Sequence, residues 1–308
     1  MRPRGICILG GTGFVGRALA SRLARDGHPL RVLTRDPEGA KALWVLPTVQ
    51  LIQGDAHDPA VLVREFRRVE AVINLVGILN ERGRDGSGFR HVHTELTQKV
   101  VDACHATDVP VLLQMSGLNA DSQRGPSHYL RSKGLAEDYI RERCAYGPQW
   151  TIIKPSVIFG PGDSFINKFA TLLRLLPPPL LLPLACATAQ FAPVYVDDVA
   201  EAFARCLDAA SRRRQTYELC GPQVMTLAEI VRFTARTLGL RRWIVPLPDP
   251  VARAQGAIFD FVPGKPFSTD NYLSATVPSV CTDDGFARLG MRPAPLTAIV
   301  PTYLRPAD

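Results

Sequence analysis

The chain has 308 residues, of which 46% are hydrophobic and 21% are charged. These values exclude a disordered chain and allow one large domain or two closely packed ones. The formal net charge of +7 comes mostly from arginine and suits an anionic ligand. A nucleic-acid partner is not expected, because the sequence has neither a basic patch interleaved with aromatic residues nor a helix-turn-helix pattern.

The cysteines bear on the cellular compartment. All seven are scattered through apolar runs without C-x-x-C spacing, which predicts neither a disulfide framework nor a zinc or other metal site. Residues 1–16 are too short and too rich in glycine for a signal peptide. We therefore expect a cytoplasmic protein, with a peripheral position at the inner face of a membrane as the alternative.

Short apolar segments alternate with helical stretches through the first half of the chain. This rhythm predicts an α/β fold in which a doubly wound parallel sheet is covered by helices on both faces. The expected strands are GICILG, LRVLT, VQLIQGD, AVINLVG, VLLQMS and WTIIKPS. The expected helices span residues 14–26, 60–68, 90–107 and 127–143.

The first strand runs directly into a glycine-rich turn, ILGGTGFVGR, and then into an amphipathic helix. In a βαβ unit the first glycine permits a tight turn, the second lets backbone N–H groups approach a pyrophosphate, and the third allows close packing of helix on strand. We predict dinucleotide binding here rather than a purely structural turn. The expected residues are Gly10, Thr12, Gly13, Phe14, Val15 and Gly16.

The end of the second strand, VLTRDP, bears on the choice of dinucleotide. An NAD site usually has an acidic residue there for the ribose 2′-hydroxyl, but Leu33 and Thr34 hold that position. Arg35 follows and is placed to pair with a 2′-phosphate. Asp36 is expected to cap the turn before Pro37. The sequence therefore favours NADP(H) over NAD(H).

Several segments together resemble the extended short-chain dehydrogenase/reductases. They are GGTGFVG, GDAHD, AVINLVG, YLRSK, KPSVIFGPGD and PVYVDDVAEA. More narrowly, AVINLVGILNE and MSGLNADSQRGPSHYLRSKGLAE resemble the atypical branch named after the dehydrogenase-like accessory subunit of respiratory complex I. Bacterial relatives of that branch are often called NAD-dependent epimerase/dehydratases. The resemblance runs from Gly5 to about Pro222.

The resemblance implies a Rossmann-type fold and further cofactor contacts. Asp55 would hold the adenine amino group. The segment Leu75, Val76 and Gly77 would pass close to the adenosine ribose, and Pro155, Ser156 and Val157 would lie beside the nicotinamide. Asp58, by contrast, is expected to cap a helix, as are Asp197 and Asp198 for the helix through Cys206.

Tyr129 and Lys133 are four residues apart in a predicted helix and so share one face of it. The resemblance implies that this helix borders the nicotinamide. There the lysine would bond the ribose hydroxyls and its charge would lower the pKa of the tyrosine from about 10. Tyr129 would then serve as a general acid or base. The alternative is a pair of ordinary surface neighbours.

A third catalytic side chain, a serine or threonine that bonds the substrate carbonyl, is also implied by the resemblance. Ser116 at the end of the fifth strand is the candidate, although it could only terminate the strand, since the acting hydroxyl aligns nearer Leu118. Ser122 and Ser127 in the following loop are alternatives. The spacing of His91 and His93 places them on different helix faces, which favours structural roles and disfavours a shared metal site.

The segment Leu172 to Val194 is nearly uncharged, but its prolines exclude a membrane-spanning helix. It is expected either to form an apolar cleft wall or to contact a hydrophobic, quinone-like substrate or a membrane partner. We divide the chain into a dinucleotide-binding domain, residues 1–154, and a smaller substrate-side subdomain, residues 155–308. The two interleave around 155–160 and 191–210.

Two functional classes follow. As an oxidoreductase or a nucleoside-diphosphate-sugar epimerase/dehydratase, the protein would act on a small-molecule or hydrophobic substrate, with Tyr129 exchanging a proton, Lys133 orienting the ribose and Ser116 holding the substrate oxygen. As a non-catalytic module, it would bind NADP(H) and associate with a respiratory or quinone-related assembly. The retained tyrosine and lysine favour the first class.

Overall fold

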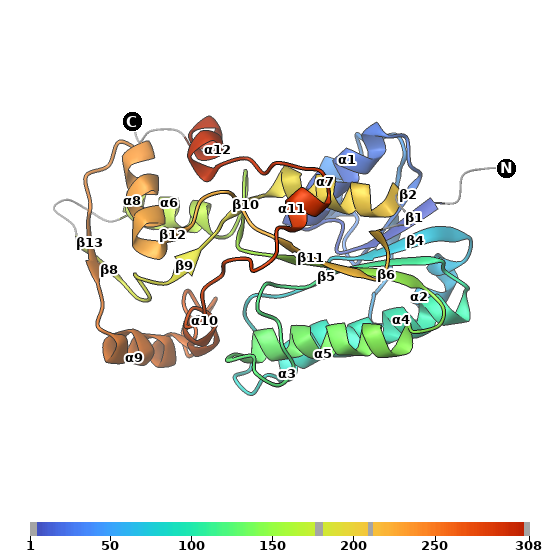
Figure 1. Ribbon diagram of the computed structural model, residues 1–308, viewed down its shortest axis with the longest axis horizontal. Coiled ribbons are helices and arrows are strands. Elements are labelled where there is room, and N and C mark those ends of the chain that lie inside the picture. Colours follow the sequence, from blue (N-terminus) through green and yellow to red (C-terminus); the bar gives the residue numbers. More distant parts are fainter. Residues whose placement is uncertain (1–4, 176–180, 209–211, 305–308) are drawn as a thin grey trace.

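The central element of this computed structural model is a seven-stranded sheet (Figure 1). The structure describes residues 5–175, 181–208 and 212–304. All its neighbouring strands are parallel, in the order β11-β6-β5-β4-β1-β2-β3. The expected α/β fold with a doubly wound parallel sheet is thus confirmed. The strands are β1 (Gly5–Leu9), β2 (Leu30–Thr34), β3 (Val49–Gln53), β4 (Val69–Asn74), β5 (Val111–Met115), β6 (Gln149–Pro155) and β11 (Gln215–Leu219).

Helices cover both faces of the sheet because its strands carry apolar side chains on both sides. Ile6 and Ile8 of β1 face a layer that contains α1 (Phe14–Arg25) and α7 (Val196–Asp208), whereas Cys7 and Leu9 face the opposite layer. Figure 1 shows these two layers above and below the sheet. The opposite layer consists of α2 (Pro59–Phe66), α4 (Leu96–Ala106) and α5 (His128–Arg143).

The order of the strands indicates where a ligand site is expected. From β1 the chain continues to β2 on one side, and it crosses later to β4 on the other side, so the connections diverge between β1 and β4. In open α/β sheets a crevice opens at such a point, outside the carboxyl ends of the strands. The glycine-rich turn after β1 and the segment after β4 lie at this edge.

The helix predicted over residues 90–107 is divided. It consists of α3 (Ser87–Phe89), a π-helical stretch (Arg90–Glu95) and α4. The other three predicted helices lie within two residues of their expected ends. Asp58 caps α2, as predicted, by accepting a hydrogen bond from the Ala60 N–H.

The second half of the chain forms a further apolar core and also returns to the sheet through α7 and β11. This core joins α6 (Ile166–Leu175), α8 (Leu227–Thr237), α12 (Leu296–Tyr303) and a strand pair. The strand pair is β8 (Leu181–Leu184) with β13 (Trp243–Pro246). The remaining elements are η1 (Glu38–Leu43), β7 (Ile158–Phe159), β9 (Gln190–Phe191), β10 (Val194–Tyr195), β12 (Met225–Thr226), α9 (Asp249–Phe259), α10 (Thr269–Ser274) and α11 (Gly285–Arg288).

The apolar segment Leu172 to Val194 falls only partly within the description, because residues 176–180 lie outside it. Leu173, Leu182 and Leu184 are buried in the second core, and Leu181 is exposed. Leu172 and Leu175 are exposed as well, so the described part of the segment is divided between the core and the surface. None of the helices that the structure describes is both long and apolar enough to cross a membrane.

Two sequence expectations are wrong. Cys220 and Cys281, 61 residues apart, form a disulfide because the segment after Ser279 packs against the end of β11. The backbone N–H of Thr282 donates there to Glu218.

Asp197 and Asp198 do not cap α7, since the helix begins before them. Their carboxylates instead accept hydrogen bonds from the Tyr195 hydroxyl and the Ala294 N–H.

Candidate functional site

The glycine-rich turn leaves the N-terminus of α1 open. Gly13 precedes the helix with an extended backbone and has no side chain to cap it. The first turn of α1 carries no acidic residue, so its N–H groups and the helix dipole are directed to an outside anion. Arg17 donates to the Thr12 carbonyl oxygen at 3.0 Å and so ties the first turn of α1 to the glycine-rich turn.

Two glycines in the turn are required by close contacts. Gly10 has φ +75°, and a β-carbon there would lie 3.0 Å from the backbone nitrogen of Val76. A β-carbon at Gly16 would lie 2.3 Å from the Gly10 carbonyl oxygen and 2.5 Å from the Gly11 Cα. The helix therefore packs directly on the turn, as the spacing predicted. These glycines bring the turn against Leu75 and Val76, so two of the predicted cofactor segments adjoin.

Lys133 reaches the third member of that segment. A β-carbon at Gly77 would lie 3.2 Å from the Lys133 ammonium nitrogen, which donates to the Met115 carbonyl oxygen at 3.2 Å. Lys133 is only 2% exposed. Burial lowers its pKa to about 8, against an opposing effect of the Glu137 carboxylate. The structure thus places a buried cation beside the segment expected to pass the ribose.

Lys133 should make the stability of the protein depend on pH between about 8 and 10.5. In this window the unfolded lysine keeps its proton while the folded one loses it, so the unfolded state binds more protons and the free energy of unfolding rises with pH. Lys133→Met should lack this rise. Chemical denaturation of both proteins at several pH values tests this, and a stability difference that does not change with pH would contradict the assignment.

Tyr129 lies on the same face of α5, in an aromatic group. Its ring packs edge-on against those of Phe89 and His93, with centroid distances of 6.0 and 5.4 Å. Burial, and then the Asp270 carboxylate, raises the pKa of Tyr129 to about 12. The expectation that Lys133 lowers this pKa is therefore wrong for the structure described. The phenol is protonated at neutral pH.

His93 is a structural residue in this group. Its Nε2 accepts from the Ile78 N–H at 3.1 Å, and its Nδ1 lies 2.8 Å from the Ser132 hydroxyl oxygen. Ser132 donates its own proton to the Tyr129 carbonyl oxygen, so Nδ1 of His93 is the donor. Burial and the Lys133 charge lower the pKa of His93 well below its usual range. A neutral imidazole thus anchors the loop after β4 to α5.

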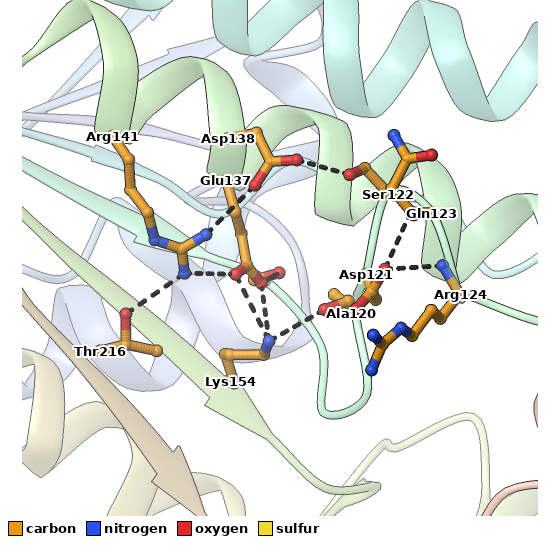
Figure 2. A network of polar contacts seen from close by, with 11 residues as sticks. Ala120, Asp121, Ser122, Gln123, Arg124, Glu137, Asp138, Arg141, Lys154 and Thr216 are labelled. Atoms are coloured by element: carbon orange, nitrogen blue, oxygen red, sulfur yellow. Dashed lines mark hydrogen bonds and ion pairs between the residues drawn. The ribbon is translucent and has the colours of Figure 1, made fainter.

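Ser116 does not point to Tyr129. Its hydroxyl donates to Glu137 at 2.5 Å, and Glu137 is 2% exposed. Figure 2 shows Arg141 and Lys154 converging on the same carboxylate, at 2.7 and 3.2 Å. A buried carboxylate requires such partners. The structure therefore places Ser116 in a polar network at the end of β5, consistent with the strand-ending alternative.

The position beside the Tyr129 hydroxyl is held by Gly117. A β-carbon there would lie 3.1 Å from the phenol oxygen. The two alternative serines are also engaged elsewhere, since Ser122 donates to Asp138 and Ser127 caps α5 by accepting from Leu130. No candidate serine of the predicted triad thus adjoins the phenol.

The residues expected at the adenosine lie together at one edge. Arg35 and Asp55 follow the neighbouring strands β2 and β3, and both are exposed. Asp55 accepts a hydrogen bond from the His57 N–H at 2.9 Å, and the His57 ring stacks on that of His91 with centroids 4.1 Å apart. As predicted, Asp36 closes its turn, by accepting from the Gly39 N–H.

The segment expected at the nicotinamide is covered by the far end of the chain. Pro155 accepts from the Leu118 N–H, and Ser156 bonds Ser279 through its hydroxyl at 2.8 Å. Val157 accepts from the Val194 N–H. This segment thus links the sheet, the loop after β5 and the segment that carries the disulfide.

Sequence reasoning missed Asp270 and Glu137. Asp270 accepts hydrogen bonds from the backbone N–H groups of His128 and Tyr129 at 2.7 and 3.2 Å and so supports the start of α5. Nothing local could have indicated a partner 141 residues away. Glu137 was detectable, because it lies four residues after Lys133 and four before Arg141.

A cavity of about 720 Å³ opens beside the start of α5, between the loop after β4 and the segment between α9 and α10. Its lining includes Arg84, Phe89, His128, Asp260, Asp270 and Leu273. Phe89 lines the cavity and packs edge-on against Tyr129, which is not itself a lining residue. In the described part of the chain, no group of three or more His, Cys, Asp or Glu side chains could hold a metal ion.

Fold and site together define a Rossmann-type dinucleotide-binding protein with a Tyr-Lys pair. The sequence matches the NAD dependent epimerase/dehydratase family over residues 6–220, and the chain belongs to that family. The family resemblance seen in the sequence is confirmed.

Among similar proteins, a ceramide reductase of Caulobacter vibrioides is 31% identical over 83% of this chain and 77% of its own. NADH dehydrogenase (ubiquinone) 1 alpha subcomplex subunit 9, mitochondrial, of Arabidopsis thaliana is 32% identical over 84% of this chain and 64% of its own. UDP-glucose 4-epimerase of Thermus thermophilus, solved with NAD, has a similar fold. It matches with a TM-score of 0.66 at 21% identity, over 88% of this chain and 97% of that one.

Proposed function

We propose that the protein is an NADP(H)-dependent oxidoreductase that reduces a carbonyl group. The observation that carries the proposal is the position of Lys133, buried against Gly77 on the same helix face as Tyr129. A bound nicotinamide would supply the hydride to the carbonyl carbon. Tyr129 would supply the proton to the carbonyl oxygen, and Lys133 would hold the ribose hydroxyls.

The protonated state of the phenol supports reduction as the proposed reaction. Because the pKa of Tyr129 is raised to about 12, the side chain is a proton donor at neutral pH rather than a base. A donor suits reduction of a carbonyl. Abstraction of a proton from an alcohol would require the phenolate, which burial and Asp270 disfavour.

A hydrophobic carbonyl compound is the proposed substrate class. The support is the similarity to a protein named ceramide reductase. The test is a screen for NADPH oxidation with long-chain keto lipids, quinones, steroids, small ketones and sugar nucleotides. Turnover with sugar nucleotides alone would contradict this substrate class.

Arg35→Ala should remove most of the preference for NADPH over NADH. Arg35 is exposed at the end of β2, where a charge-assisted contact with a 2′-phosphate contributes about 1.5–3 kcal/mol, or roughly 10- to 150-fold in affinity. Calorimetry with both cofactors measures the change. Arg25→Ala, which removes an exposed arginine from the last turn of α1, is the matched control. Equal affinities of the unmodified protein for NADPH and NADH would contradict the assignment.

A second candidate function is that of a non-catalytic NADP(H)-bound accessory protein of a respiratory assembly. Its specific support is the engagement of Ser116 by Glu137 and the glycine at position 117, together with the similarity to a complex I subunit. This function predicts tight NADPH binding without NADPH oxidation in the screen. It also predicts that Tyr129→Phe leaves assembly of the complex unchanged.

A further inference from the structure

Helix α10 bonds the start of α5 through the side chain of Asp270. One carboxylate oxygen accepts a hydrogen bond from the His128 N–H at 2.7 Å, and the other accepts from the Tyr129 N–H at 3.2 Å. The next N–H of the helix, that of Leu130, is bonded by the Ser127 hydroxyl. Because the first N–H groups of a helix have no partner within it, these bonds satisfy donors that α5 cannot satisfy itself.

Helix α10 is held at both of its ends. At its start, Ser268 and Asn271 form a capping box. The Ser268 hydroxyl also donates to the Asn80 side chain at 3.1 Å, and the Asn271 amide donates to the Leu79 carbonyl oxygen at 3.3 Å. At its far end, the Ser274 hydroxyl donates at 2.8 Å to the hydroxyl that caps α5. Helix α10 therefore joins the loop after β4 to the start of α5, beside which it lies in Figure 1.

The Tyr129 side chain has little freedom to compensate for a shift of the helix start. Its ring packs edge-on against the rings of Phe89 and His93. On the side of the hydroxyl, a β-carbon at Gly117 would lie 3.1 Å from the phenol oxygen. A misplacement of about 1 Å can cost a reaction roughly 100-fold in rate. The place of the phenol thus depends on the backbone bond that Asp270 makes at the same residue.

The carboxylate of Asp270 also acts on the phenol through its charge. The titratable groups around the phenol are His93 from the π-helical stretch, Lys133 from α5 and Asp270 from α10. His93 stays neutral, because burial lowers its pKa well below the usual range. After burial itself, the Asp270 carboxylate is the cause that raises the pKa of the phenol. Asp270 in turn faces His128 and Glu81, and both its oxygens accept N–H bonds, as those of an ionised carboxylate do.

We propose that Asp270 is a positioning residue for Tyr129, because its carboxylate fixes the first turn of α5 and favours the phenol form that donates a proton. The effect on turnover rests on the proposed reduction, in which Tyr129 supplies that proton. Asp270 acts through the backbone and through its charge, without touching the substrate. On this proposal the C-terminal half of the chain completes the geometry of the active site as well as covering it.

Asp270→Ala should lower kcat for NADPH-dependent reduction by roughly 10- to 100-fold and leave the Kd for NADPH within about twofold. Both backbone bonds are lost, whereas the cofactor is held by the glycine turn, Arg35 and Lys133. Asp270→Asn keeps one acceptor oxygen and should recover part of kcat. The matched control is Asp284→Ala, which removes a carboxylate that caps α11 by accepting from the Ala287 N–H at 2.9 Å. Its kcat should stay within about twofold of the unmodified protein.

Two measurements test the placement of Tyr129 without turnover. In Asp270→Ala, the backbone N–H groups of His128 and Tyr129 should exchange with solvent at least roughly tenfold faster by NMR, while that of Leu130 is unchanged. In Asp270→Asn, an absorbance titration should show the phenol ionising at a lower pH than in the unmodified protein, because a neighbouring negative charge is gone. Tyr129→Phe in both backgrounds identifies the phenol signal. A side chain that only capped the helix would not change this titration.

Three results would overturn the proposal. The two N–H groups could exchange equally fast with and without Asp270. The kcat of Asp270→Ala could match that of the Asp284→Ala control. The phenol could ionise at the same pH in Asp270→Asn and in the unmodified protein. If the unmodified protein reduces no carbonyl compound in the screen, the proposed reaction fails, and the exchange and titration experiments decide by themselves whether Asp270 positions Tyr129. Should Asp270→Ala not fold, the same comparisons are made with Asp270→Asn.

Discussion

Tyr129→Phe is expected to lower kcat for NADPH-dependent reduction by at least ~100-fold while leaving NADPH affinity unchanged. The phenol donates its proton in the transition state, whereas the cofactor is held by the glycine turn, Arg35 and Lys133. Lys133→Met should harm both kcat and NADPH binding, since the ammonium lies against Gly77, where the ribose is proposed to pass, and shares a helix face with Tyr129.

The same helix offers a matched control for this experiment. The Tyr139 hydroxyl bonds Asp102 of α4 at 3.0 Å, ten residues along α5 from Tyr129, so Tyr139→Phe removes a phenolic oxygen away from the site. It should leave kcat within about twofold of the unmodified protein. A Tyr129→Phe protein that turns over as fast as the control would exclude the proton-donor role. If the unmodified protein oxidises NADPH with no substrate in the screen, the accessory function replaces the enzymatic one.

Gly16→Ala is expected to destabilise the protein by roughly 3 kcal/mol or more and to abolish NADPH binding. The added β-carbon would lie 2.3 Å from the Gly10 carbonyl oxygen and 2.5 Å from the Gly11 Cα. Both are backbone atoms of the turn itself, so the clash cannot be relieved by a side-chain rotation. The turn and the start of α1 must separate, and the N–H groups that would bind the pyrophosphate are displaced.

Gly27→Ala is the control for this change. Gly27 follows the same helix and has φ +78°, but no atom lies within 4 Å of the position of an added β-carbon. Its substitution should cost only about 1 kcal/mol of backbone strain and should not affect NADPH binding. Chemical denaturation and calorimetry of the two variants give both quantities. If Gly16→Ala matched Gly27→Ala in both, close packing of α1 on the turn would not be what positions the site.

Local sequence patterns were sufficient to predict most of the secondary structure in the dinucleotide-binding half. The six strands predicted there are all present, because each is a short apolar run that needs two covered faces. The glycine spacing identified the turn, and the four-residue spacing identified the shared face of Tyr129 and Lys133. In each case the signal lies within about ten consecutive residues, where backbone geometry alone dictates the arrangement.

The seventh strand was missed for a physical reason. β11 has the sequence QTYEL, and only Tyr217 and Leu219 are buried, since the strand lies at the edge of the sheet. So short and polar a segment becomes a strand only because β6 offers an unpaired edge. Its formation then brings Cys220 within reach of Cys281, a disulfide that no cysteine spacing indicated.

By itself, the sequence determined the α/β class, the glycine turn, the positions of the main helices and the shared helix face of Tyr129 and Lys133. Only the tertiary structure decided which way the hydroxyl of Ser116 points and what state the Tyr129 phenol has. Ser116 turns to Glu137 because that buried carboxylate requires donors, and the pKa of Tyr129 rises because its side chain is shielded from solvent near the Asp270 carboxylate. Such effects depend on solvent exclusion and on partners distant in the chain, which no local pattern encodes.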